Sequence, residues 1–235
     1  MNYAFFIGGS GARTYRALLH AAAMGVLHTN EIKVMRIDAD YTNQAHSDCD
    51  ALYKQYQNIH QMAANTKKIF QCDIMPMCKD VVSPVYSSAS KLLELVGQEN
   101  PDRIRMLKAL YTKDEQKQDL TGGFYSHPNI GCIFFSNLRN PELQNCIAEI
   151  ATRLQNGESV DIALIGSIFG GTGASGIPAI YKLICSQLAG NPHFDKLTIG
   201  GIFLTPYFKV KDQSNNVSEN IPIHMDEFYF NTYQA

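Results

Sequence analysis

Short runs of apolar residues alternate along this chain with longer segments in which apolar residues recur at helical spacing. Tyr3–Ile7 is an apolar run that ends at a glycine, and the segment after it, up to Gly25, has the length and spacing of a helix. A second strand is predicted over Ile32–Ile37, with acidic residues at its end. The first forty residues therefore predict a strand, a glycine turn, a helix and a strand, which is the opening βαβ unit of a parallel sheet.

The second half of the chain shows the same alternation. Ile130–Asn137 is predicted as a strand, followed by a helix with Asn140 as its cap and Gly157 as its stop. The run "VDIALIGSIF" is typical of a strand buried on both faces, and "KLTIGGIFLTPYF" is predicted as another buried strand. Between them lies a glycine-rich turn with a helix over Gly176–Leu188, and "MDEFYFNTYQA" predicts the opening of a last helix.

The middle of the chain, from about Tyr41 to Pro128, is less regular and contains helical pieces such as "PDRIRMLKALYTKDEQK". No linker rich in Gly, Ser or Pro separates it, so it is predicted as a helical excursion from the sheet within a single domain over 1–235. The alternation of strands and helices predicts an α/β fold: a doubly wound, mostly parallel sheet with helices on both faces. Ligands of such sheets bind at the carboxyl ends of the strands.

Both glycine turns fall at predicted carboxyl ends, where a helix N-terminus offers unpartnered amides and a partial positive charge. Such a terminus attracts anions, most often phosphate, and two turns in one sheet predict two loops that grip one polyphosphate. The candidate residues are Gly8, Gly9, Ser10, Gly11 and Arg13 in the first turn, and Gly170, Gly171, Thr172, Gly173, Ala174 and Ser175 in the second. Thr172 and Ser175 would add hydroxyl groups, and Gly171→Ala is expected to abolish binding because its methyl would intrude on the phosphate path.

Two acidic residues, Asp38 and Asp40, follow the second predicted strand. They are expected to hold a water-coordinated Mg²⁺ beside the phosphates or to accept a hydrogen bond from a ribose hydroxyl. Neither glycine turn is followed by Gly-Lys-Ser/Thr, so the lysine of a P-loop is missing. Neutralisation of the phosphates is therefore expected from amides, helix dipoles and the metal.

Composition narrows the class of protein. The 235 residues carry a formal net charge of −2 without a basic patch, which argues against nucleic-acid binding. The six cysteines form no CxxC pair and are interpreted as free thiols in a reducing cytoplasm. No apolar stretch approaches the roughly 18–20 residues that would span a membrane, and the N-terminus does not have the pattern of a signal peptide.

Several segments together resemble the tubulin and FtsZ superfamily of GTP-binding filament proteins, and especially its divergent bacterial tubulin-like members. "IGGSGAR" is similar to the family's first phosphate loop, "RIDAD" to the segment where an acidic residue helps place Mg²⁺, and "FGGTGAS" to the signature glycine loop. "IGGIFLTPYF" is similar to the strand after that loop, and "FYFNTYQA" to the start of the central helix. Phe169 departs from the pattern, because it stands where relatives carry the first glycine of the signature loop, and Ser175 replaces the last one.

The resemblance implies a nucleotide-binding domain that ends at the start of the central helix, with the family's C-terminal domain absent from this chain. It implies GTP or GDP with Mg²⁺ as ligands, Asp40 as a metal ligand through water, and Asn231 as the residue that reads guanine. It also implies a homo-oligomer or filament, and GTP hydrolysis only when subunits stack head to tail. Because the family's catalytic loop lies beyond the central helix, the isolated chain is expected to hydrolyse GTP slowly or not at all.

Two alternatives stay open. One is an NAD-binding Rossmann protein, since Gly8–Thr14 approximates GxGxxG and Asp38 follows at a distance suited to a ribose-binding acid. The other is a non-catalytic assembly scaffold on a degenerate nucleotide fold.

Overall fold

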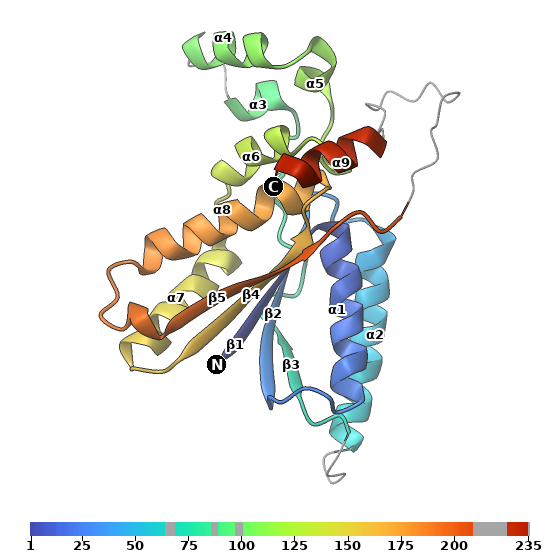
Figure 1. Ribbon diagram of the computed structural model, residues 1–235, viewed down its shortest axis with the longest axis vertical. Helices are drawn as coiled ribbons and strands as arrows, with labels where there is room; N and C mark the ends of the chain where they lie inside the picture. The colour runs from blue at the N-terminus through green and yellow to red at the C-terminus, as the bar shows by residue number, and fades with distance from the viewer. Residues whose placement is uncertain (64–68, 86–88, 97–100, 209–224, 235) are drawn as a thin grey trace.

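A parallel β-sheet forms the centre of the molecule. The computed structural model describes residues 1–63, 69–85, 89–96, 101–208 and 225–234 (Figure 1). Within them the sheet has five strands in the order β3-β2-β1-β4-β5, and every neighbouring pair is parallel. The strands are β1 (Asn2–Ile7), β2 (Glu31–Ile37), β3 (Asp73–Pro76), β4 (Val160–Ser167) and β5 (Leu197–Leu204). The prediction of an α/β fold with a parallel sheet is confirmed.

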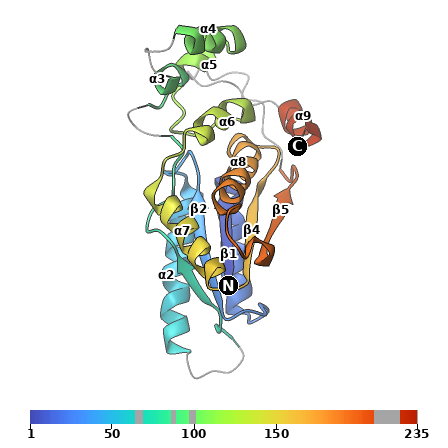
Figure 2. The same ribbon diagram turned by 90° about the vertical axis from the view of Figure 1, so that its left-hand side faces the viewer.

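Helices cover both faces of this sheet. On one face lie α1 (Gly8–Ala23) and α2 (Gln44–Met62), and on the other lie α7 (Pro141–Gln155) and α8 (Gly171–Leu188) (Figures 1 and 2). Above the carboxyl ends of the strands lie α6 (Pro128–Ser136) and α9 (Met225–Gln234). The prediction of a helical excursion over about Tyr41 to Pro128 is wrong for the first part of that range, because α2 packs against α1 and β3 joins the sheet. The later part does leave the sheet: α3 (Leu92–Val96), α4 (Pro101–Leu110) and α5 (Lys113–Lys117) gather beyond α6 (Figure 1). A short 3-10 turn, Phe194–Lys196, leads into β5.

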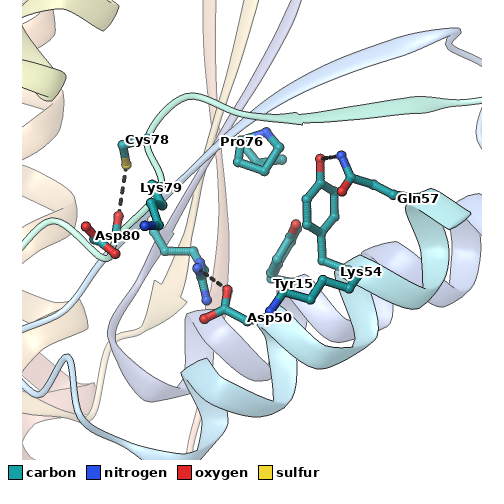
Figure 3. Close-up of a pocket in the computed structure, with 11 residues that line it drawn as sticks. Tyr15, Asp50, Lys54, Gln57, Pro76, Cys78, Lys79 and Asp80 are labelled. Atoms are coloured by element: carbon teal, nitrogen blue, oxygen red, sulfur yellow. Dashed lines mark hydrogen bonds and ion pairs between the residues drawn. The ribbon is translucent and has the colours of Figure 1, made fainter.

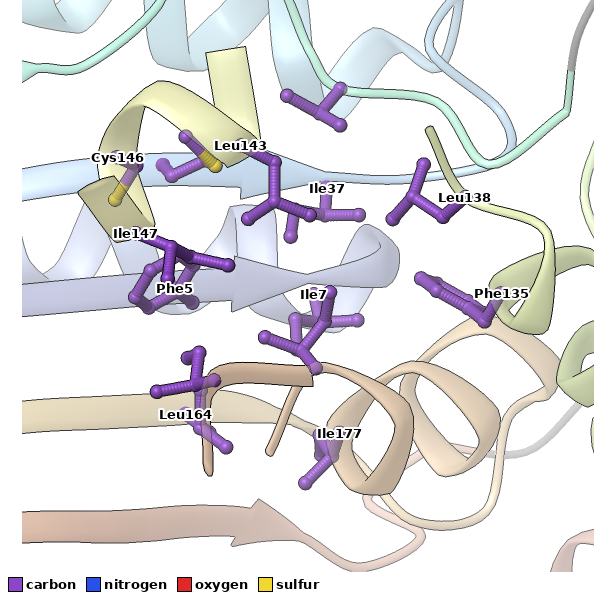
Figure 4. Close-up of a cluster of buried hydrophobic side chains, with 14 of the residues drawn as sticks. Phe5, Ile7, Ile37, Phe135, Leu138, Leu143, Cys146, Ile147, Leu164 and Ile177 are labelled. Carbon is purple, nitrogen blue, oxygen red and sulfur yellow. The ribbon is translucent and has the colours of Figure 1, made fainter. Parts of the chain in front are cut away.

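Each face of the sheet is sealed by its own apolar cluster. Phe5, Ile7 and Leu164 point toward α7 and α8, where they meet Ile147 and Ile177 (Figure 4). On the opposite face, Phe6 packs against Tyr15 of α1, with ring centroids 5.1 Å apart. Alternate residues of β1 pack into the clusters on opposite faces, so this central strand is buried on both faces. Its side chains thereby hold the helices of both faces against the sheet.

The helix predicted over Gly176–Leu188 begins earlier, at Gly171, so most of the second glycine turn is the first turn of α8. Two further predicted elements differ from the structure. Ile130–Asn137 was expected as a strand, but the segment is helical and forms most of α6. Pro128 occupies the first turn of that helix, where its missing N–H costs nothing. The second difference is β5, which was expected to be buried: it lies at the sheet edge, and Ile202 and Phe203 are 51% and 55% exposed. An edge strand has only one neighbour, so its apolar character alone does not bury it.

Candidate functional site

The two glycine turns meet at the centre of the sheet's carboxyl edge. The chain runs from β1 outward to β3, then returns to the other side of β1 for β4 and β5. The strand order therefore reverses between β1 and β4, and the crevice at such a switch point is where open α/β sheets bind ligands. A Cβ placed on Gly8 would lie 3.4 Å from the amide nitrogen of Gly173 and 3.4 Å from Cβ of Thr172. The N-termini of α1 and α8 are thus direct neighbours.

Glycine is required at several of these positions by packing within the protein. Gly8 has a φ of +76°, which side chains rarely adopt. A Cβ on Gly11 would lie 2.8 Å from the carbonyl carbon of Phe6, and one on Gly173 would overlap the carbonyl oxygen of Ser167. Both helices cross the strand ends so closely that no methyl group fits between them.

Gly171→Ala was expected to abolish binding because its methyl group would enter the phosphate path, and this reason is wrong. A Cβ there would lie 2.6 Å from Cβ of Phe124, a buried aromatic residue in the loop before α6. Gly171 is therefore a glycine because Phe124 packs on it, and loss of binding in Gly171→Ala would report disturbed packing. Gly9 differs: among the described residues outside its own helix backbone, a Cβ at this position would approach only Nδ2 of Asn43, at 3.8 Å. Packing does not demand a glycine at position 9.

Polar side chains of the first turn face a segment that follows β5. Ser10 is 9% exposed, and its Oγ lies 3.2 Å from the hydroxyl of Tyr207. Arg13 is exposed and donates from Nη1 to the same hydroxyl over 2.8 Å. A cation and a hydroxyl therefore lie within the first turns of α1, next to the amides of the helix N-terminus.

The second turn offers fewer free groups than the sequence predicts. Ser175 is completely buried, and its hydroxyl donates to the carbonyl oxygen of Gly171 over 2.6 Å, so it serves its own helix and does not face the crevice. Ala174 donates its amide to Gly170 over 3.3 Å, and Thr172 is buried at 9% exposure with no hydrogen bond from its hydroxyl to any described residue. Thr172 is thus the hydroxyl of this turn that a ligand can still engage.

The two acidic residues after β2 have different environments. Asp38 is 3% exposed and bonds Nε2 of His46 over 2.9 Å, which turns it inward, away from any ribose. Burial raises the pKa of the Asp38 carboxyl, while the bond to His46 opposes that rise. Asp40 is partly exposed and accepts from Thr42 over 2.9 Å and from Asn43 over 3.2 Å. Only Asp40 is placed to hold water around a metal.

Asn231 of α9 lies close to the second turn. Its Nδ2 donates to the carbonyl oxygens of Ser126, over 2.8 Å, and of Phe169, over 3.2 Å. The residue is 8% exposed, and its amide oxygen accepts no hydrogen bond from the described residues. These bonds hold α9 beside the residue that precedes Gly170.

The loop just before α6 was not predicted as part of the site, although it lies against three of the predicted residues. Phe124 packs on Gly171, Ser126 accepts from Asn231, and a Cβ on Gly123 would lie 3.9 Å from Cβ of Asp40. Tyr125 and Ser126 have φ angles of 45° and 64°, a strained conformation for residues other than glycine. Nε2 of the following His127 is buried without a hydrogen-bond partner among the described residues. The Gly122-Gly123 pair was the available signal for this turn.

Two hollows lie beside the crevice, along α2. The one in Figure 3 has a volume of about 300 Å³ and opens between α2 and β3, with Lys54 and Lys79 at its rim. Its wall includes the ion pair of Arg36 and Asp50, at 2.6 Å. The second, of about 570 Å³, shares Lys79 with the first and reaches Asn43, which lies next to Gly9.

The described part of the chain contains no cluster of three or more His, Cys, Asp or Glu side chains that would bind a metal directly. All six cysteines are free, as predicted, but the expectation that they are buried holds only for Cys49, Cys72 and Cys146. Among the described helices, none has the length and apolar character needed to cross a bilayer. Comparison with family models, with curated proteins and with solved structures found no match for this chain.

Proposed function

We propose that this chain binds a guanine nucleotide, with the phosphates on the paired N-termini of α1 and α8. The observation that carries the proposal is the close approach of Gly8 to Thr172 and Gly173, where an added Cβ would be in van der Waals contact with both, at the switch point of a parallel sheet. Two helix N-termini side by side concentrate unpartnered amides and partial positive charge in one place. A polyphosphate satisfies both ends at once, whereas a single anion satisfies only one.

Side chains at the crevice fit this ligand. Arg13 supplies a positive charge, and Ser10 and Thr172 supply hydroxyls next to the amides. The open space over Gly9 gives a phosphate a close approach to the backbone of α1. Arg13 thus takes the part that a lysine plays in a P-loop.

Asp40 fits a Mg²⁺ held through water. Its two oxygens accept one bond each, from Thr42 and Asn43, and retain lone pairs for water. A single carboxylate with water and phosphate as the other ligands is how proteins usually bind Mg²⁺. The ion would neutralise phosphate charge that Arg13 alone does not.

The choice of guanine comes from the resemblance, and Asn231 is compatible with it. Because Nδ2 of this residue is anchored to Ser126 and Phe169, its amide oxygen is oriented and is left as an acceptor. An acceptor suits the N1–H and 2-amino edge of guanine. We further propose, on the resemblance alone, that the protein self-assembles and that GTP turnover depends on contact between subunits, and so rises with protein concentration.

An assembly scaffold without nucleotide is the second candidate. The observation in its favour is the exposed edge of β5, which pairs only with β4 among the described strands and has Ile202 and Phe203 facing solvent. The NAD-binding alternative has less support, because Asp38, its candidate ribose-binding acid, is hydrogen-bonded to His46.

Binding assays with GTP, GDP, ATP and NAD in the presence of Mg²⁺ separate these functions. The proposal expects GTP and GDP to bind more tightly than ATP, and NAD not to bind. A chain that self-associates but binds none of the four ligands would favour the scaffold, and binding of NAD alone would favour a Rossmann oxidoreductase.

A further inference from the structure

The segment after β5 reaches across the sheet edge and contacts the start of α1. Tyr207 comes three residues after the end of β5, and its hydroxyl accepts a hydrogen bond from Nη1 of Arg13 over 2.8 Å. The same hydroxyl lies 3.2 Å from Oγ of Ser10. One oxygen atom therefore engages both polar side chains in the first turns of α1.

An aromatic cluster fixes this arrangement. Phe169, buried just before Gly170, contacts the rings of Tyr207 and Phe208 edge to face, with centroids 5.9 Å and 5.7 Å away. The guanidinium carbon of Arg13 lies 5.7 Å from the centroid of the Phe208 ring. Phe169 stands at the position of the first glycine in the signature loop of the resembling family. Its ring packs beneath Tyr207 and Phe208. Edge-to-face rings and a cation over a ring face are both favourable geometries.

We infer that Tyr207 is a latch on the phosphate site, which a nucleotide must displace in order to bind. The inference rests on the proposed function. A phosphate oxygen on the α1 terminus would take hydrogen bonds from the Ser10 hydroxyl and the Arg13 guanidinium, and both already engage the Tyr207 oxygen. The phenol is neutral, so it satisfies these groups without the charge that a phosphate brings.

The latch is built to open. Tyr207 is 52% exposed and Phe208 is 39% exposed, so both rings lie at the surface of the protein. The apparent nucleotide affinity is therefore the affinity of the open site multiplied by the fraction of molecules in which the latch is open. Strengthening or weakening the two hydrogen bonds of Tyr207 would tune binding without altering any group that touches the nucleotide.

Tyr207→Phe tests the latch because it removes only the oxygen. A hydrogen bond contributes about 0.5–1.5 kcal/mol, so the variant should bind GTP roughly 3- to 10-fold more tightly than the wild type. The matched control is Tyr233→Phe, since the Tyr233 ring is 96% exposed and its hydroxyl bonds no described residue. That control should bind GTP and unfold like the wild type. Tyr207→Phe should stay folded, and its unfolding temperature should fall by no more than the loss of its bonds to Ser10 and Arg13 accounts for.

The outcomes separate the latch from the proposed function. If GTP binds the wild type and Tyr207→Phe binds equally or more weakly, Tyr207 is a spectator or a direct ligand contact, and the latch is refuted. If GTP binds none of the proteins, Tyr207→Phe included, the proposed function fails and the latch falls with it. Tighter binding by Tyr207→Phe alone supports both.

Discussion

The start of α1 touches the start of α8: a Cβ on Gly8 would stand 3.4 Å from the amide nitrogen of Gly173. These residues are 165 positions apart in the sequence, and β1 and β4 bring them together by pairing in parallel, with Ile7 opposite Gly166. The contact makes the two glycine turns one structural unit, so a change in either turn is expected to affect the other.

Gly173→Ala should destabilise the fold more than any other single methyl added in the turns. The new Cβ would overlap the carbonyl oxygen of Ser167, which is backbone and cannot rotate away. We expect a loss of about 3 kcal/mol or more in the free energy of unfolding, measured by urea denaturation. Gly190→Ala is the control, because a Cβ there has no atom within 4 Å. Wild-type stability in Gly173→Ala would mean that α8 does not cross β4 this closely.

Asn231→Ala should loosen α9 from the sheet edge. The change leaves the carbonyl oxygens of Ser126 and Phe169 without their donor, so the free energy of unfolding should fall by about 1–3 kcal/mol. Asn145→Ala, at an exposed position of α7, should change stability by less than about 0.5 kcal/mol. Equal urea midpoints for the two variants would contradict the anchoring role of Asn231.

Glu149→Gln should reduce the acid sensitivity of the fold. Burial raises the pKa of this carboxyl, but hydrogen bonds from Lys33, Arg153 and Tyr3 outweigh burial and leave the pKa below its ordinary value. A lowered pKa in the folded state contributes stability at neutral pH that is lost as pH falls through that pKa. The variant should therefore be less stable at pH 7, by about 1–2 kcal/mol, and lose less on acidification below about pH 4.5.

Thermal unfolding of Glu149→Gln and wild type across pH 3–7 checks this expectation. The control is Asp161→Asn, which changes an exposed carboxylate on β4 and should retain the acid sensitivity of the wild type. Parallel stability curves for Glu149→Gln and wild type would show that this carboxylate does not couple to folding.

β1 and β4 were predictable because both strands are largely buried and a glycine turn follows each of them. The same apolar signal failed at Ile130–Asn137, where a run of eight residues suits a buried helix as well as a strand. Two features favour the helix: Pro128 in its first turn, and the place of the segment above the carboxyl ends of the strands. The long α2 and the four-residue β3 escaped prediction because α2 buries few residues along its length and β3 is very short.

Site residues were predictable as positions but not as roles. The sequence places Asp38 and Gly171 at strand and helix ends, yet their partners come from other elements of the chain. His46 takes the Asp38 carboxylate, and Phe124 takes the space over Gly171. Such tertiary partners leave no local pattern, which is also why the Tyr207 contact with Arg13 could be found only in the fold.

The measurement that tests nucleotide binding most directly is calorimetric titration of GTP with Mg²⁺ into the wild type, Gly9→Ala and Gly190→Ala. A methyl at Gly9 meets only Nδ2 of Asn43, at 3.8 Å, so the fold should tolerate it, and alanine is the better helix former. The account predicts GTP binding by wild type and Gly190→Ala, and a loss of at least about tenfold in affinity for a folded Gly9→Ala, equivalent to about 1.4 kcal/mol. Equal GTP affinity in all three proteins, or no binding by the wild type, would contradict a phosphate site at the start of α1.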